Sequence, residues 1–83
     1  MQMQYEKTIK AVRRNGLILQ LVREQTPEIC LEAVKQNGCA LLYVRKQTPE
    51  ICIEAVKQDG WALMYVNPEF ESICEKYLKK ARN

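Results

Sequence analysis

Apolar residues between positions 27 and 37 recur at the spacing of one face of an α-helix. The residues that form this stripe are Ile29, Cys30, Ala33 and Val34. Thr26 can accept a hydrogen bond as the N-cap, and Pro27 suits the first helical position, where its missing N–H costs nothing. Gly38 suits the left-handed conformation that commonly ends a helix. The pattern therefore predicts a helix over about Pro27–Asn37, with Gly38 in that left-handed conformation.

The same pattern returns 22 residues further along the chain, and aligning residues 23–44 with 45–66 leaves 17 of 22 positions identical. Residues 1–22 match the second unit at seven positions, and residues 67–83 keep only part of the pattern. Repeats that cannot bury an apolar face alone are stabilised by stacking, with atypical units at the ends. We therefore predict one repeat domain over residues 1–83, with units 1–22, 23–44 and 45–66 and a cap at 67–83.

The second half of each unit, CALLYVRKQ or WALMYVNPE, suits two kinds of structure. Ala40, Leu41 and Val44 match one face of a short helix, but so short an apolar run also suits a buried strand. We expect a short helix, roughly Ala40–Arg45, because alanine and leucine favour helices. In addition, only about three residues remain before the next helix start, too few for the crossover of a parallel sheet. The strand stays open as the alternative.

A last helix is predicted after Asn67, where Pro68 and Glu69 repeat the helix-start signal. It should extend from about Pro68 to Lys80 and bury one apolar face. That face consists of Phe70, Ile73, Cys74, Tyr77 and Leu78. Together these patterns predict an all-α fold, a small solenoid of stacked helix–turn–short-helix repeats with a diverged N-terminal unit and a C-terminal capping helix.

The phrase EICLEAVKQNGxALxYV in residues 28–44 resembles a tandem-repeat family known only as a domain of unknown function. The repeats of that family have about two dozen residues and are built around AVKQNGxAL. The resemblance is close over residues 25–66, looser over 6–22 and weak in the tail. It implies repeated short helices, no established activity and no functional residues to carry over. By association alone, so short an array suggests a small binder or inhibitor of the kind that viruses and mobile elements encode.

Composition and charge narrow the function classes. The chain has 83 residues, of which 47% are hydrophobic and 28% charged, as expected for a soluble folded domain. No apolar run approaches the roughly 20 residues that cross a bilayer, and the first residues do not resemble a signal peptide. We therefore expect no membrane partner and a cytoplasmic location, in the producing cell or in a host cell. The net charge of +3 is too small to require a nucleic-acid partner by itself.

Residues that carry out catalysis are sparse. There is no histidine, Ser72 is the only serine, and no glycine-rich phosphate loop is present. Cys30, Cys52 and Cys74 occupy one position of three units, which is typical of a ladder of small core residues. No pair of cysteines has the spacing of a zinc site. We expect no catalytic, cofactor-binding or metal-binding residues, and hence no enzyme.

One polar feature repeats along all four units. Arg13, Lys35, Lys57 and Lys79 lie 22 residues apart, and Arg14 and Lys80 widen this basic column at its ends. Such a row of cations suits the phosphates of a nucleic acid or an acidic protein surface. Alternatively, the cations only complement the negative ends of the helix dipoles.

Trp61 is the remaining candidate, because exposed tryptophan is enriched at binding hot spots. The alternative is that Trp61, which follows a glycine stop, packs back on Val56 of its own helix. We predict a non-enzymatic, macromolecule-binding module, most simply a small protein-binding adaptor or inhibitor. The alternative is a nucleic-acid-binding protein that uses the basic column. A homodimer stays open, because a short array can bury its ends against a second copy.

Overall fold

The computed structural model describes the backbone of residues 2–82 and the side chains of residues 5–80. Within residues 2–82 the chain forms α-helices and 3₁₀-helices (η) and no strand. In chain order these are α1 (Gln2–Arg14), η1 (Gly16–Leu21), α2 (Pro27–Gln36), η2 (Gly38–Tyr43), α3 (Pro49–Gln58), η3 (Gly60–Tyr65) and α4 (Pro68–Arg82). The first and last residues of the predicted domain, Met1 and Asn83, lie outside the described residues.

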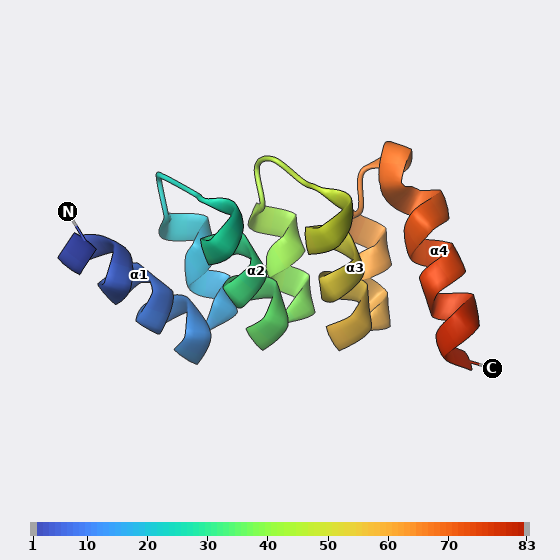
Figure 1. Cartoon of the computed structure of the whole chain (residues 1–83), viewed down its shortest axis with the longest axis horizontal. Helices are drawn as coiled ribbons and strands as arrows, with labels where there is room; N and C mark the ends of the chain where they lie inside the picture. The colour runs from blue at the N-terminus through green and yellow to red at the C-terminus, as the bar shows by residue number, and fades with distance from the viewer. Residues whose placement is uncertain (1, 83) are drawn as a thin grey trace.

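The elements form an elongated array that measures 42 × 21 × 16 Å. The four α-helices lie side by side in chain order, and the 3₁₀-helices form a second row behind them (Figure 1). The predicted all-α repeat fold is thus confirmed. The strand alternative for the second half of each unit is wrong, and the short helix expected at Ala40–Arg45 is the 3₁₀-helix η2.

The predicted helix starts are confirmed atom by atom. The Thr26 hydroxyl accepts a hydrogen bond from the Ile29 N–H at 3.1 Å, and Thr48 does the same for Ile51 at 3.2 Å. Pro27 occupies the first turn of α2, where no N–H is needed. An N-cap of this kind contributes about 1 kcal/mol to helix stability.

The predicted helix ends are wrong in conformation. Among the described residues no glycine has a positive φ, so Gly38 does not adopt the left-handed conformation. Asn37 is the hinge instead, with extended backbone at φ −151° and ψ 109°. Its N–H donates to the Ala33 carbonyl at 2.9 Å, and its side-chain oxygen accepts from the Cys39 N–H at 2.9 Å. One asparagine therefore ends α2 and begins η2.

The glycines are needed for close approach between units. A Cβ atom on Gly16 would lie 2.3 Å from the Ala33 carbonyl oxygen of α2, and one on Gly38 would lie 2.5 Å from the Ala55 carbonyl oxygen of α3. Both distances are far below the contact distances that real Cβ atoms make. Gly60 differs, because a Cβ there would meet nothing within 4 Å. Only the first two glycines lie where the start of a 3₁₀-helix meets the next α-helix.

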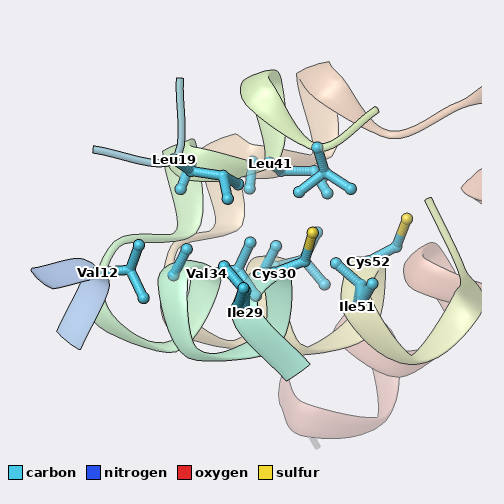
Figure 2. Packing of buried hydrophobic residues seen from close by; sticks show 14 of the residues in the cluster. Val12, Leu19, Ile29, Cys30, Val34, Leu41, Ile51 and Cys52 are labelled. Carbon is cyan, nitrogen blue, oxygen red and sulfur yellow. The ribbon is translucent and has the colours of Figure 1, made fainter. Parts of the chain in front are cut away.

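The core lies between the two rows of helices. Leu19 and Leu41 of the 3₁₀-helices face Val12, Val34 and the other buried residues of the α-helices (Figure 2). The apolar stripe predicted for α2 is fully buried, which confirms it. The residues at the three equivalent cysteine positions, Cys30, Cys52 and Cys74, are also buried, and all are free thiols.

The capping helix confirms most of its predicted buried face. In α4, Cys74 is buried, and Phe70, Tyr77 and Leu78 are partly buried against the core. Ile73 is the exception, because 42% of its surface is exposed. It lies instead beside Tyr77 in a hollow on the surface of α4.

Two glutamines, Gln25 and Gln47, close their units through hydrogen bonds that no local sequence pattern predicts. Gln25, just before α2, donates its amide N–H to the Tyr43 carbonyl at the end of η2, at 2.8 Å. Its side-chain oxygen accepts from the Arg45 N–H at 3.0 Å. Gln47 repeats both bonds one unit later, to the Tyr65 carbonyl at 2.7 Å and from the Asn67 N–H at 2.8 Å. Each carboxamide thus ties the start of one α-helix to the end of the 3₁₀-helix that follows it.

Candidate partner-binding surface

The basic column is interrupted by an acidic residue. All of its cations are exposed on the four α-helices. They are Arg13, Arg14, Lys35, Lys57, Lys79 and Lys80. The Arg13 guanidinium lies 2.8 Å from one carboxylate oxygen of Glu32, and the Lys35 ammonium lies 3.9 Å from the other. Glu32 therefore joins the cations of units 1 and 2 and reduces the positive potential between them.

The helix-dipole interpretation of the column has direct structural support. Arg13 and Arg14 occupy the last turn of α1, Lys35 that of α2 and Lys57 that of α3. Cations at this position stabilise a helix by about 0.3–1 kcal/mol. The column position therefore has a folding role even without a ligand.

The end of the column has a different environment. Lys79 and Lys80 line a hollow of about 470 Å³ on α4 together with Lys76, Ile73 and Tyr77. This hollow brings two of the candidate residues together beside an exposed isoleucine. Lys57 has no ion pair among the described residues, so it is the free cation in the middle of the column.

Trp61 is exposed, so the interpretation in which it packs back on α3 is wrong. Its side chain is 74% exposed, although Trp61 lies in the first turn of η3 and its N–H donates to the Asp59 side chain at 3.0 Å. The packing-back contact depends on a left-handed glycine stop, which Gly60 does not form. The indole ring is therefore presented to solvent from a fixed point of the backbone.

Met64 and Leu42 extend this exposed apolar surface. A 3₁₀-helix has three residues per turn, so Met64 lies directly above Trp61 on the same face of η3. Met64 is 70% exposed. Leu42 occupies the same register position in the adjacent η2 and is 55% exposed. We call Leu42, Trp61 and Met64 the apolar ridge.

The exposure of Leu42 and Met64 has a signal in the sequence, although neither residue was among the predicted site residues. Unit 1 has the polar Gln20 at the same register position, also exposed. A position that accepts glutamine in one unit does not need an apolar side chain for folding. The apolar residues in the other two units therefore mark surface positions.

The cysteines are poor candidates for chemistry. Burial raises the pKa of the Cys52 thiol to about 12, and the nearby Cys74 adds to the shift. Burial also raises the pKa of Cys30 and of Cys74, although the charge of Arg45 partly opposes it at Cys30. The pKa of Cys39 is raised by burial and then by the Asp59 carboxylate, which accepts a hydrogen bond from its thiol at 3.6 Å. Protonated thiols are weak nucleophiles and weak metal ligands.

Metal ligands do not cluster in the part of the chain that the structure describes, where no group of three or more cysteine, aspartate or glutamate side chains could hold an ion. None of the helices in this part is both long enough and apolar enough to cross a membrane.

A larger groove lies at the other end of the array. It has a volume of about 740 Å³ and lies between α1, η1 and the start of α2. Its apolar lining includes Tyr5, Ile18, Leu21 and Val22. In Figure 1, α1 leans outward, so its first turns diverge from η1 and α2. The groove is therefore a consequence of the diverged first unit.

Comparison with known proteins identifies the family. The family described as "Domain of unknown function (DUF4116)" matches the chain twice, over residues 6–47 and 26–71. The two overlapping matches agree with a repeated unit, and together they include most of the chain. The chain belongs to this family. Neither the comparison with curated proteins nor the comparison with solved structures gives a match.

Proposed function

We propose that this member of the family is a non-enzymatic module that binds another protein through the apolar ridge. The observation that carries the proposal is the exposure of Trp61 and Met64 on one face of η3, at 74% and 70%. Tryptophan and methionine are enriched at protein interfaces, and a buried tryptophan is a frequent hot spot. The fold does not need either side chain in its core, so their exposure supports a role in binding.

The setting of the ridge also supports protein binding. Leu42 lies one unit away at the same register, so the apolar surface continues across two adjacent 3₁₀-helices. The Trp61 backbone is fixed by Asp59, which lowers the entropy lost when a partner covers the indole. Exposed Lys35 and Lys57, at the ends of α2 and α3, supply charge for steering an acidic protein surface.

The interruption of the basic column favours a protein over a nucleic acid. A nucleic-acid site needs several cations that track the phosphates. Here Glu32 binds Arg13 and lies within 3.9 Å of Lys35, so a negative charge stands inside the row. An adaptor or inhibitor role is the form of protein binding that we propose, because a module that binds without catalysis acts by occupying a surface of its partner.

The proposal is tested by affinity capture from cells that express the protein, with bound proteins quantified for three variants. Trp61→Ala should reduce capture of the specific partner at least about tenfold, as expected for a hot-spot residue. Ile73→Ala is the matched control, because Ile73 is an exposed apolar residue of α4 that lies outside the ridge. The charge-reversed variant Lys35→Glu/Lys57→Glu should reduce capture only modestly, and mainly at low salt.

The outcomes separate the alternatives. Loss of capture with Ile73→Ala, but not with Trp61→Ala, would contradict a site on the ridge. Binding that falls steeply with salt, survives Trp61→Ala and is lost when Lys35 and Lys57 are reversed would favour the nucleic-acid alternative.

A further inference from the structure

The first unit lacks the glutamine that closes the other two. Gln25 and Gln47 each bridge a carbonyl and an N–H two residues further on, at the end of the 3₁₀-helix in their own unit. The residue at this register position in the first unit is Met3, which has no carboxamide. A methionine can neither donate to the carbonyl nor accept from the N–H with comparable strength.

The two backbone groups that such a glutamine would bridge are present in unit 1. They are the Leu21 carbonyl and the Arg23 N–H, which correspond to Tyr43 and Arg45 in unit 2. Among the described residues, no group hydrogen-bonds either of them. The neighbouring carbonyls of Val22 and Arg23 are already taken by the Arg45 guanidinium. Within the described part of the chain, the groups left without a hydrogen bond, the Leu21 carbonyl and the Arg23 N–H, are thus the two that correspond to the groups bonded by the glutamine carboxamide in the later units.

The large groove opens at this point. Leu21, Val22 and Arg23 all line it, with Tyr5 and Ile18 as its apolar walls. Thr8 also lines the groove, at the register position where Cys30 and Cys52 donate their thiol hydrogens to the glutamine oxygens at 3.6 and 3.2 Å. In units 2 and 3 the corresponding space receives the chain's own glutamine. In unit 1 the Leu21–Arg23 segment that would bond such a glutamine lines the groove.

We propose that this groove binds a short segment of a partner protein in which a glutamine lies between apolar residues. The glutamine carboxamide donates to the Leu21 carbonyl and accepts from the Arg23 N–H, as Gln25 and Gln47 do in their own units. The apolar neighbours contact Tyr5 and Ile18. The site lies in the N-terminal unit, and binding of this segment does not involve the residues of the apolar ridge.

The test uses the full chain and the peptide acetyl-Leu-Gln-Leu-amide, followed by two-dimensional ¹H–¹⁵N NMR. On titration, the Arg23 amide proton should shift downfield, because it gains a hydrogen bond. The amides of Arg45 and Asn67 are the internal controls, since they are already bonded at 3.0 and 2.8 Å and should not shift. Peptides with methionine or glutamate in place of glutamine should bind at least about tenfold more weakly, because methionine makes neither bond and glutamate has no N–H for the Leu21 carbonyl.

A matched pair of protein variants locates the site. Leu21→Asp, at the rim of the groove, should abolish peptide binding, whereas Leu42→Asp, on the apolar ridge, should leave it unchanged. Both side chains are exposed, so neither change removes a core contact.

Four results would overturn the proposal. They are no binding at millimolar peptide, equal binding of the methionine peptide, shifts centred on the Trp61 indole, and an Arg23 shift that depends on protein concentration without peptide. The last result would identify a second copy of the chain as the occupant. None of these results bears on whether Trp61→Ala disrupts protein capture, so the two proposals can fail separately.

Discussion

Gly38 should not accept a side chain, whereas Gly60, at the same position of the next unit, should accept one. A Cβ on Gly38 would lie 2.5 Å from the Ala55 carbonyl oxygen, 3.0 Å from the Asp59 Cβ and 3.2 Å from the Asp59 N. Two of these three atoms belong to the backbone, so no side-chain rotation relieves the clash. A Cβ on Gly60 would meet nothing within 4 Å, and its backbone φ is not positive.

The magnitude follows from these distances. The Cβ and the Ala55 oxygen must separate by about 0.9 Å to reach the 3.4 Å at which ordinary contacts begin. This movement pushes α3 away from η2 and loosens the core between units 2 and 3, which by analogy with overpacked cores costs about 1–3 kcal/mol. Gly60→Ala should instead stabilise the fold by about 0.4–1 kcal/mol, because alanine restricts the unfolded chain. The two variants should therefore differ by about 1.4–4 kcal/mol.

Urea unfolding followed by circular dichroism at 222 nm measures this difference. Gly38→Ala should lower the midpoint with an unchanged m-value, and Gly60→Ala should leave the midpoint unchanged or raise it. In thermal unfolding, Gly38→Ala should lower the Tm by about 5–20 °C, since about 1 kcal/mol shifts a domain of this size by 4–8 °C. Equal midpoints for the two variants would refute the close-approach argument. A large loss with Gly60→Ala would show instead that conformational freedom is what these glycines provide.

Two further predictions concern the interior. Gln47→Glu should destabilise the fold by about 1–3 kcal/mol, because a carboxylate has no N–H for the Tyr65 carbonyl. Gln58 is exposed, so the control variant Gln58→Glu should change the stability by less than about 0.5 kcal/mol. Paired urea titrations measure both changes. Because the pKa of Cys52 rises from 9.0 to about 12 on folding, the protonated thiol favours the folded state. The resulting stabilisation should be complete below pH 9 and lost between about pH 9 and 12. Urea midpoints at pH 7 and pH 10 should show this decline, and the decline should be smaller in Cys52→Ala than in the native chain.

The helix starts were predictable because their chemistry is local. Thr26 and Pro27 act on residues within one turn, so four letters of sequence contain the whole interaction. The burial of Ile29 and its neighbours was also predictable, because helical spacing places them on one face whatever packs against it. Both predictions needed only the geometry of a single helix.

The roles of Gly38 and Gln25 were not predictable in the same way. Helix-ending glycines are usually left-handed, so the local rule gave the wrong conformation for Gly38. Its actual constraint comes from a carbonyl 17 residues away in α3, which depends on how the units stack. The bond from Gln25 to the Tyr43 carbonyl likewise joins residues 18 positions apart. Gln47 repeats Gln25 with the same bonds, but Gly60 repeats Gly38 without its close contact, so repetition alone does not show which atoms a residue contacts.

The positions at which the two central units differ indicate which surface residues the fold does not restrict. Of the five positions that differ, Leu31/Ile53 conserves an apolar side chain, and Asn37/Asp59 conserves the oxygen that accepts from the second following N–H. Glu24/Lys46 is exposed, so folding does not restrict it.

The other two differing positions, Cys39/Trp61 and Leu42/Met64, lie three residues apart on the outer face of the 3₁₀-helices. At Leu42/Met64 the first unit carries an exposed glutamine, Gln20, whereas both central units carry large apolar side chains there. Exposed apolar side chains that the fold does not require are typical of binding surfaces. The 3₁₀ row thus has two faces: its inner face packs in the core through residues such as Leu19 and Leu41, whereas its outer face varies and is the face that we propose for partner binding.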